Sequence, residues 1–371
     1  MINPIAFGVS LLLGILIIIF EHRKFLPNQF SFKKFSKIIF TFFFLSFLLS
    51  SLHSHNIQRS IPVFAYLIGF IIVSYSLFCC LKKDSILLQQ ILKYFVLSSY
   101  LNIIFIFAYD LYHFDYEIYA EVKKFKGILN IITITTLLIP LFKKSKLNLL
   151  IILPLIPSII MSNCNSAFLG IILACITCVI FHAYLNIFKS KFFLTFLLLL
   201  SLVFSSLLIK SLPEDFNKTS IDNFEFKIST QLIDAHRQFI WGFSLSKFKE
   251  RLGIGYGPDT SNFIDGSQEI IGHKSTGDMT YIPSHPHNFF IELLLETGIF
   301  GTVSFFLFLI LINIHIYRHS ILREKYILIF YNTYFWSTSL VNFSFWLGWW
   351  QGSYFFLLAL ITSRNFSQKK K

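Results

Sequence analysis

The stretch YIPSHPHNFFIELLLETGIFG, residues 281–301, joins a long polar segment to an apolar one. Two histidines, a proline and an asparagine occupy positions 285–288, directly before the apolar part. Asparagine is favoured at helix starts, and proline is compatible with a chain that enters a helix. The stretch therefore predicts a hydrophobic helix that begins after Asn288 and carries Glu292 and Glu296, one turn apart, on one face.

The rest of the chain is also largely apolar. Of its 371 residues, 55% are hydrophobic and 14% are charged, and the mean hydropathy is +0.66. A soluble domain carries about 25% charged residues. Apolar runs of about 15–25 residues recur from end to end, which is typical of membrane-crossing helices. The sequence predicts an all-α polytopic membrane protein.

The apolar runs predict about 11 transmembrane helices, within a range of about 10–12. They lie at about 4–20, 38–52, 61–81, 86–108, 128–142, 147–161, 166–188, 192–209, 289–312 and 326–361. The last run is long enough for two crossings, so we expect two short helices that turn near 342–344. The chain would divide into N-terminal membrane helices (1–209), a large polar segment (210–288), and C-terminal membrane helices with a basic tail (289–371).

The formal net charge is +13, and the positions of the charged residues indicate which kind of partner this charge favours. In a soluble protein such an excess would favour nucleic-acid binding. The polar segment holds eight Lys or Arg and ten Asp or Glu residues, so the positive excess lies in short loops between the spans. Basic loops of this kind stay in the cytoplasm; they are 21–37, 82–85, 143–146, 189–191, 318–325 and the C-terminal tail. We therefore expect the N-terminus and the polar segment outside, and no nucleic acid as a partner.

The polar segment has features that a simple linker would lack. It contains Trp241, several other aromatic residues and a helical pattern over 229–251. The run GIGYGP at 253–258 then predicts a turn. This run is similar to part of a dinucleotide fingerprint, but no predicted strand precedes it and no βαβ unit surrounds it. We expect no nucleotide cofactor.

His287 is a candidate for chemistry because an imidazole can accept a proton near neutral pH. Free backbone N–H groups and the helix dipole at the predicted helix start favour an anion nearby. The alternative is that His285 and His287 serve only as part of the helix start. A metal site is a second alternative, but a His-x-His pair without a firmly spaced third ligand is weak support for one. We predict no metal.

Arg237 is the second candidate, because arginine is suited to bidentate recognition of phosphate. A solvated arginine without a ligand is the alternative. Three tryptophans, Trp346, Trp349 and Trp350, are expected to form a belt at the membrane interface, and a platform for a sugar ring is the alternative.

Two blocks of residues carry a resemblance to a known family. The first is His287-Asn288, then nine residues, then Gly298-Ile299-Phe300-Gly301. The second is Arg237 with Ile240-Trp241, followed by Gly-Ile-Gly-Tyr-Gly at 253–257. Together they resemble the bacterial O-antigen ligase and polymerase family over roughly 140–310. The first block is similar to the His-Asn…Gly-x-x-Gly motif of the ligases.

The resemblance implies a glycosyltransferase of the bacterial inner membrane that acts at the periplasmic face. The donor would be a glycan linked to undecaprenyl diphosphate. The acceptor would be the lipid A–core oligosaccharide of lipopolysaccharide, or another lipid-linked repeat unit in a polymerase. Such chemistry needs no cofactor, and membrane lipids would surround the chain. A lipid or solute transporter is the alternative of another class, and it predicts charges or broken helices near the bilayer midplane.

The resemblance also assigns expected roles. Arg237 would stabilise the departing diphosphate and His287 would accept the proton of the acceptor hydroxyl. Asn288, Glu296 and Trp241 would bind the substrates, and Glu296 would also orient His287 or the acceptor. The family usually has a Ser-Arg pair at the outer end of an earlier span, and here Asn165 stands where that arginine is expected. Asn165 could bind a phosphate or sugar without the charge, which leaves Arg237 as the main candidate for the diphosphate.

Overall fold

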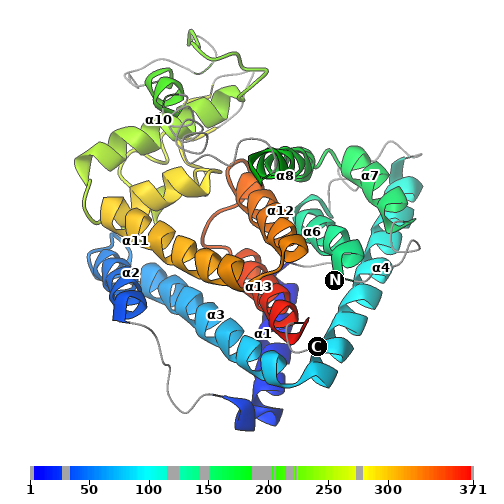
Figure 1. The fold of residues 1–371 in the computed structure, drawn as a ribbon. Helices are drawn as coiled ribbons and strands as arrows, with labels where there is room; N and C mark the ends of the chain where they lie inside the picture. The colour runs from blue at the N-terminus through cyan, green and yellow to red at the C-terminus, as the bar shows by residue number, and fades with distance from the viewer. Residues whose placement is uncertain are drawn as a thin grey trace.

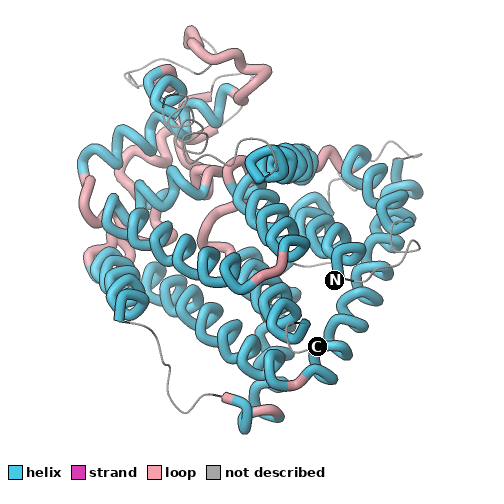
Figure 2. The backbone as a smooth tube through the Cα atoms, viewed as in Figure 1, coloured by secondary structure: helices cyan, strands magenta, loops and turns pink. Residues whose placement is uncertain are grey.

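The protein is described by a computed structural model that covers residues 4–26, 34–114, 125–142, 150–185, 203, 205–213, 221, 224–272 and 279–368. Helices make up most of these residues, and Figure 2 shows loops as the other main component. The only strand-like pairing in this part of the chain is a single antiparallel bridge between Ile270 and Thr280. The predicted all-α class is confirmed.

Eleven α-helices are described in these residues. They are α1 (Pro4–Glu21), α2 (Lys34–Leu52), α3 (Ile57–Lys83), α4 (Ser85–Phe114), α6 (Lys126–Phe142), α7 (Ile152–Met161), α8 (Asn165–Ala183), α10 (Ala235–Glu250), α11 (Phe289–His319), α12 (Leu322–Ser339) and α13 (Gly348–Gln368). Two short 3-10 helices, η1 (Arg23–Phe25) and η6 (Ser261–Phe263), complete the set. Figure 1 shows α10 at one end of the helical bundle, beside the start of α11.

Five of the described helices are long and apolar enough to cross a membrane, judged by length and composition. They are Lys34–Leu52, Ile57–Lys83, Ser85–His113, Asn165–Ala183 and Phe289–His319. Three shorter apolar helices accompany them: Val9–Glu21, Lys126–Ile139 and Ile152–Met161. The expected span at 192–209 falls mostly outside the described residues, as do the basic loops 143–146 and 189–191. The structure supports a multi-pass membrane protein, while the count of about 11 crossings and the three-part division stay predictions.

The run 326–361 is divided into two helices, as the sequence predicts. Helix α12 ends at Ser339 and α13 begins at Gly348, and residues 340–347 form a loop between them. The expected tryptophan belt is wrong for Trp346 and Trp350, which are 6% and 2% exposed. The Trp350 ring stacks on Phe335 with centroids 4.1 Å apart, and its N–H donates to Ser339 Oγ at 2.7 Å. A buried indole needs such a hydrogen-bond partner, and the last residue of α12 supplies it within the core.

Helix α11 begins where the sequence predicts. Asn288 Oδ1 accepts hydrogen bonds from the backbone N–H groups of Phe290 at 3.1 Å and Ile291 at 3.2 Å. This is the N-cap arrangement, in which a side chain satisfies donors that have no partner within the helix. The cap places the preceding histidines at the helix start.

The regular course of α11 is broken at Gly298, whose φ is 64°. The break frees the N–H groups of Ile299 and Phe300, and these donate to the carbonyls of Leu252 and Gly253 at 2.8 and 3.2 Å. In return, the carbonyls of Leu295 and Glu296 accept from the N–H groups of Tyr256 and Gly257 at 3.1 and 2.8 Å. Buried backbone groups need partners, so the chain at 252–257 replaces the helical bonds that the break removes.

We call this contact between 252–257 and 295–300 the glycine junction. A Cβ added at Gly298 would lie 2.2 Å from the Gly253 carbonyl oxygen, and one at Gly255 would lie 2.4 Å from the Glu296 carbonyl carbon. Only glycine allows the two backbones to come this close. The two motif blocks that are separate in the sequence are therefore in direct contact.

The described part of the polar segment packs around its own apolar cluster. The cluster includes Phe239, Trp241, Tyr281 and Ile282, and it continues onto Leu295 of α11. Helix α10 is shorter than the pattern over 229–251 predicts, because Asp234 caps it by accepting the N–H of Arg237 at 3.3 Å. The cluster fixes α10 against the first turns of α11.

Candidate active site

The structure gives the His287 ring a defined proton position. Its backbone is in the left-handed region, with a φ of 54°, which turns the chain sharply before α11. Its Nδ1 lies 3.1 Å from the carbonyl oxygen of Asn342. A carbonyl oxygen only accepts, so Nδ1 carries the hydrogen and Nε2 of the neutral ring keeps its lone pair. Nε2 is then the basic atom.

His285 has the opposite arrangement. Its Nδ1 accepts the backbone N–H of His287 at 3.1 Å, so the neutral ring carries its hydrogen on Nε2. The two ring centroids are 4.1 Å apart. Sequence reasoning set His285 aside in favour of His287. In the structure the two rings lie together, with Nε2 of His287 as a hydrogen-bond acceptor and Nε2 of His285 as a donor.

Arg237 lies in the first turn of α10, close enough to influence both imidazoles. Burial is the main cause that lowers the pKa of His285 to about 3, and the positive charge of Arg237 lowers it further. Burial also lowers the pKa of His287; the Asn342 carbonyl opposes this, while Arg237 and His236 add to it. Both rings are therefore neutral near pH 7, and His287 is in the form that can accept a proton.

The guanidinium of Arg237 is partly exposed, and among the described residues it makes no hydrogen bond or ion pair. Its backbone N–H is the group that binds Asp234. An arginine without a carboxylate partner, set beside two neutral imidazoles and the starts of two helices, provides favourable electrostatics for an anion.

Trp241 supports the site from within the protein. It lies one turn after Arg237 on α10, and its indole N–H donates to the carbonyl of Pro286 at 2.9 Å. The side chain is buried, with 6% of its surface exposed. The structure therefore gives Trp241 a role in holding the segment 285–288 against α10, and not the exposed face that a sugar ring would need.

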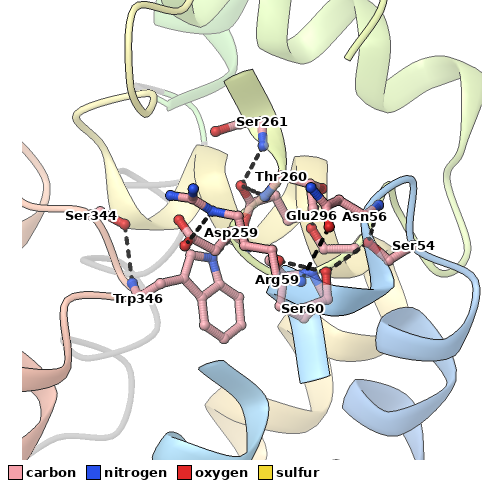
Figure 3. Close-up of polar contacts among 12 residues, drawn as sticks. Ser54, Asn56, Arg59, Ser60, Asp259, Thr260, Ser261, Glu296, Ser344 and Trp346 are labelled. Atoms are coloured by element: carbon pink, nitrogen blue, oxygen red, sulfur yellow. Dashed lines mark hydrogen bonds and ion pairs between the residues drawn. The ribbon is translucent and has the colours of Figure 1, made fainter. Parts of the chain in front are cut away.

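Glu296 is fully buried, and both carboxylate oxygens are occupied (Figure 3). They accept the backbone N–H groups of Asp259, Thr260 and Ser261 at 2.7, 3.0 and 2.8 Å, together with the indole N–H of Trp346. None of its described hydrogen bonds goes to His287. The expected contact between Glu296 and His287 is absent from these bonds, and the carboxylate instead joins the turn after the glycine junction to the loop 340–347.

Glu292 is also fully buried and binds the same loop. Its carboxylate accepts the hydroxyl of Ser344 at 2.6 Å and the backbone N–H of Phe345 at 2.5 Å. Sequence reasoning placed the two acids on one face but gave a role to Glu296 alone. The sequence did indicate a structural role for Glu292, because an acidic side chain inside an apolar span requires polar partners.

Asn165 is the first residue of α8 and is exposed. Its neighbour Ser166 accepts the side-chain N–H of Asn342 at 3.2 Å and donates to Asn130 at 3.2 Å. The start of α8 is therefore linked to His287 through Asn342. Sequence reasoning missed both Ser166 and Asn342, although Asn342 lies at the predicted turn.

A metal centre finds little support in the described residues. In that part of the chain, no group of three or more His, Cys, Asp or Glu side chains is arranged to hold a metal ion. The described structure thus offers the His285–His287 pair no third ligand of these types.

The fold and the site define a multi-pass helical membrane protein with a histidine–arginine cluster at one end of its bundle. Residues 149–306 match the model of the family described as O-antigen ligase, so this part of the chain is similar to that family. The matched range contains both motif blocks, so the resemblance inferred from them is confirmed.

Several curated proteins also match part of the chain. Candidate polysaccharide ligases of Rickettsia conorii and Rickettsia prowazekii are each 31% identical to it over 170 residues, and one of Rickettsia felis is 29% identical over 169 residues. The matches cover 44% of this chain and 40% of each relative, so the chain spans less than half the length of these proteins. No solved structure matches the chain.

Proposed function

We propose that this protein transfers a glycan from undecaprenyl diphosphate to the lipid A–core oligosaccharide at the periplasmic face of the bacterial inner membrane. The polar segment 210–288 would then lie in the periplasm. The observation that carries the proposal is the site itself: Nε2 of a neutral His287 stands near Arg237, at the starts of α10 and α11. The family match over 149–306 supports ligase chemistry for this geometry.

The proposed reaction is a displacement at the anomeric carbon of the donor glycan. The acceptor hydroxyl oxygen forms a new bond to that carbon, and the bond from the carbon to the diphosphate oxygen breaks. The diphosphate leaves with the electron pair, and the hydroxyl proton passes to Nε2 of His287. Arg237 and the N-terminal end of α11 stabilise the charge that develops on the diphosphate.

A polymerase that joins lipid-linked repeat units would use the same bonds with a different acceptor. A ligase is favoured over a polymerase because the matching family model is described as O-antigen ligase. A deletion strain separates the two. Loss of all capped lipopolysaccharide with accumulation of lipid-linked polymer identifies a ligase, whereas capping by a single repeat unit identifies a polymerase.

The direct test is transfer by the purified protein in nanodiscs, with an undecaprenyl-diphosphate-linked glycan and lipid A–core as substrates. His287→Ala should reduce transfer by about a hundredfold or more while the protein inserts normally, because the general base is lost. His319→Ala, at the far end of the same helix, is the matched control and should keep wild-type activity. Wild-type transfer by His287→Ala refutes the proposal. Flipping of the lipid-linked glycan without product would support a transporter instead.

A further inference from the structure

The loop 340–347 provides the atom that sets the proton position of His287. That atom is the carbonyl oxygen of Asn342, 3.1 Å from Nδ1 of the ring. A backbone carbonyl can orient a ring only if its own peptide is held in place. The contacts that fix this loop therefore determine which nitrogen of His287 is basic.

Glu292 holds the loop from the side of α11. It accepts the hydroxyl of Ser344 at 2.6 Å and the N–H of Phe345 at 2.5 Å, two and three residues beyond Asn342. Ser344 Oγ also accepts the N–H of Trp346 at 3.1 Å, which tightens the same turn. Both carboxylate oxygens of Glu292 are thus committed to residues 344–345.

A second anchor holds the loop from the opposite side. The side chain of Asn342 donates to Ser166 Oγ at 3.2 Å, at the start of α8. Ser166 in turn donates to Asn130 of α6 at 3.2 Å, and Asn130 is fully buried. The Asn342 peptide is therefore fixed between α8 and α11.

The contacts through Glu292 form a closed circuit. Glu292 lies five residues after His287, in the first turns of the helix that Asn288 caps. Its carboxylate fixes residues 344–345 of the loop 340–347. The same loop contains Asn342, whose carbonyl oxygen accepts a hydrogen bond from the ring of His287, the residue before the cap. The start of α11 therefore carries both His287 and Glu292, the carboxylate that holds the loop whose carbonyl orients the His287 ring.

We propose that Glu292 is a positioning residue which fixes the Nδ1–H tautomer of His287 through the turn at 342–345. Glu292 touches no reacting atom in this arrangement. It keeps the Asn342 carbonyl in place, so that the lone pair of His287 remains on Nε2. The effect on glycan transfer rests on the proposed function, whereas the effect on the tautomer does not.

Glu292→Gln is the sharpest variant, because it keeps the size of the side chain and removes one acceptor. Ser344 and Phe345 donate to different oxygens of the carboxylate, and an amide replaces one of these oxygens with an NH2 group that cannot accept a hydrogen bond. Ser344→Ala removes one of the same hydrogen bonds from the loop side and provides a second route if the glutamine variant fails to fold. Thr297→Val is the matched control, since Thr297 is buried in the same helix and, among the described residues, its hydroxyl bonds only to the Leu293 carbonyl.

The primary readout is nitrogen NMR of histidine-labelled protein in nanodiscs, with the His287 signals assigned by their loss in His287→Gln. The wild-type protein and Thr297→Val should show a single Nδ1–H tautomer. Glu292→Gln and Ser344→Ala should both show a mixture in which Nε2–H appears. An unchanged single tautomer in folded Glu292→Gln, or in folded Ser344→Ala where the first variant does not fold, overturns the inference.

Transfer kinetics provide the second readout. The kcat of Glu292→Gln should fall by less than about a hundredfold, because general-base catalysis is reduced and not abolished. Its KM should stay within twofold of wild type, since donor binding is untouched. A tautomer mixture with no drop in kcat would leave the positioning role intact and would refute His287 as the base. The two proposals can therefore fail separately.

Discussion

The glycine junction and the histidine segment (285–288) lie on the same helix, yet they differ in how far their polar groups are satisfied. At the junction four backbone groups around the break at Gly298 are paired with 252–257, and the Glu296 carboxylate uses both oxygens. At the histidine segment, His287 keeps a basic nitrogen and the nearby Arg237 guanidinium has no described partner. Saturated groups contribute stability, whereas groups without partners are available for a ligand.

The largest effect on activity should come from removing the positive charge of Arg237, which lies near the histidine segment. Arg237→Gln should reduce transfer by about a hundred- to a thousandfold, because an electrostatic contact to the leaving diphosphate is lost. The free energy of unfolding should be unchanged. Lys249→Gln, which removes a positive charge from the other end of α10, is the control and should retain activity.

The same variant changes the pH dependence in a defined direction. The pKa of His287 is lowered in the folded protein, so the decline of transfer on acidification should occur at a lower pH than an ordinary imidazole would give. Arg237 is one of the causes of the lowering. Its removal should therefore raise the pKa and move the decline of the residual activity to higher pH. A decline that moves to lower pH would contradict this assignment.

The largest effect on stability should come from the junction. Gly298→Ala should lower the free energy of unfolding by about 3 kcal/mol or more, since φ is positive and the new Cβ meets the Gly253 carbonyl. Gly69→Ala, where an added Cβ meets nothing within 4 Å, should leave stability near wild type. Thermal and denaturant unfolding in mild detergent measure both. Equal stability of the two variants would show that the close approach is not needed.

A smaller loss of stability is expected from Glu296→Gln. The amide nitrogen would face N–H donors, so at least one of the groups at 259–261 or Trp346 loses its partner. The cost should be about 1–3 kcal/mol. Unfolding in the same detergent measures it, with the exposed Glu225→Gln as control. If transfer falls far more than stability, Glu296 has a role in catalysis beyond support.

The smallest effect should come from the ion pair between Arg59 and Asp259, 2.8 Å apart (Figure 3). It joins the start of α3 to the turn after the junction. The Arg59 side chain is 44% exposed, so Arg59→Gln should cost no more than about 1 kcal/mol. Unfolding at low and high salt is the measurement. The difference between wild type and variant should shrink as salt is added, because exposed charges are screened.

Much of the site could be predicted because its residues have strong local preferences. Asn288 is a favoured cap before an apolar helix, and the structure confirms it in that position. The division of 326–361 into two helices followed from charge and length, and α12 and α13 confirm it. Arg237 and His287 were singled out by residue type and spacing, and the structure brings the α10 turn of Arg237 close to the His287 ring.

Other features could not be predicted because they depend on contacts between distant segments. The carbonyl that orients His287 belongs to Asn342, 55 residues away. Glu296 was expected near His287, yet its partners come from 259–261 and Trp346. Trp241 is buried where sequence reasoning expected it to bind the substrates, and Trp350 is buried where it expected a belt at the membrane interface. Neither hydropathy nor residue spacing indicates which loop packs against which helix in the folded protein.

The sequence by itself determined the membrane class, the family blocks, the start of α11 and the identity of the candidate base. These depend on composition, helix capping and residue type, which act over a few neighbouring residues. Only the tertiary structure decided that the two glycine blocks pack together, that Glu292 and Glu296 bind loops, and that Nε2 of His287 is the basic nitrogen. The physical reason is that buried polar groups must be paired, and the partner is whichever segment the fold brings within hydrogen-bond distance.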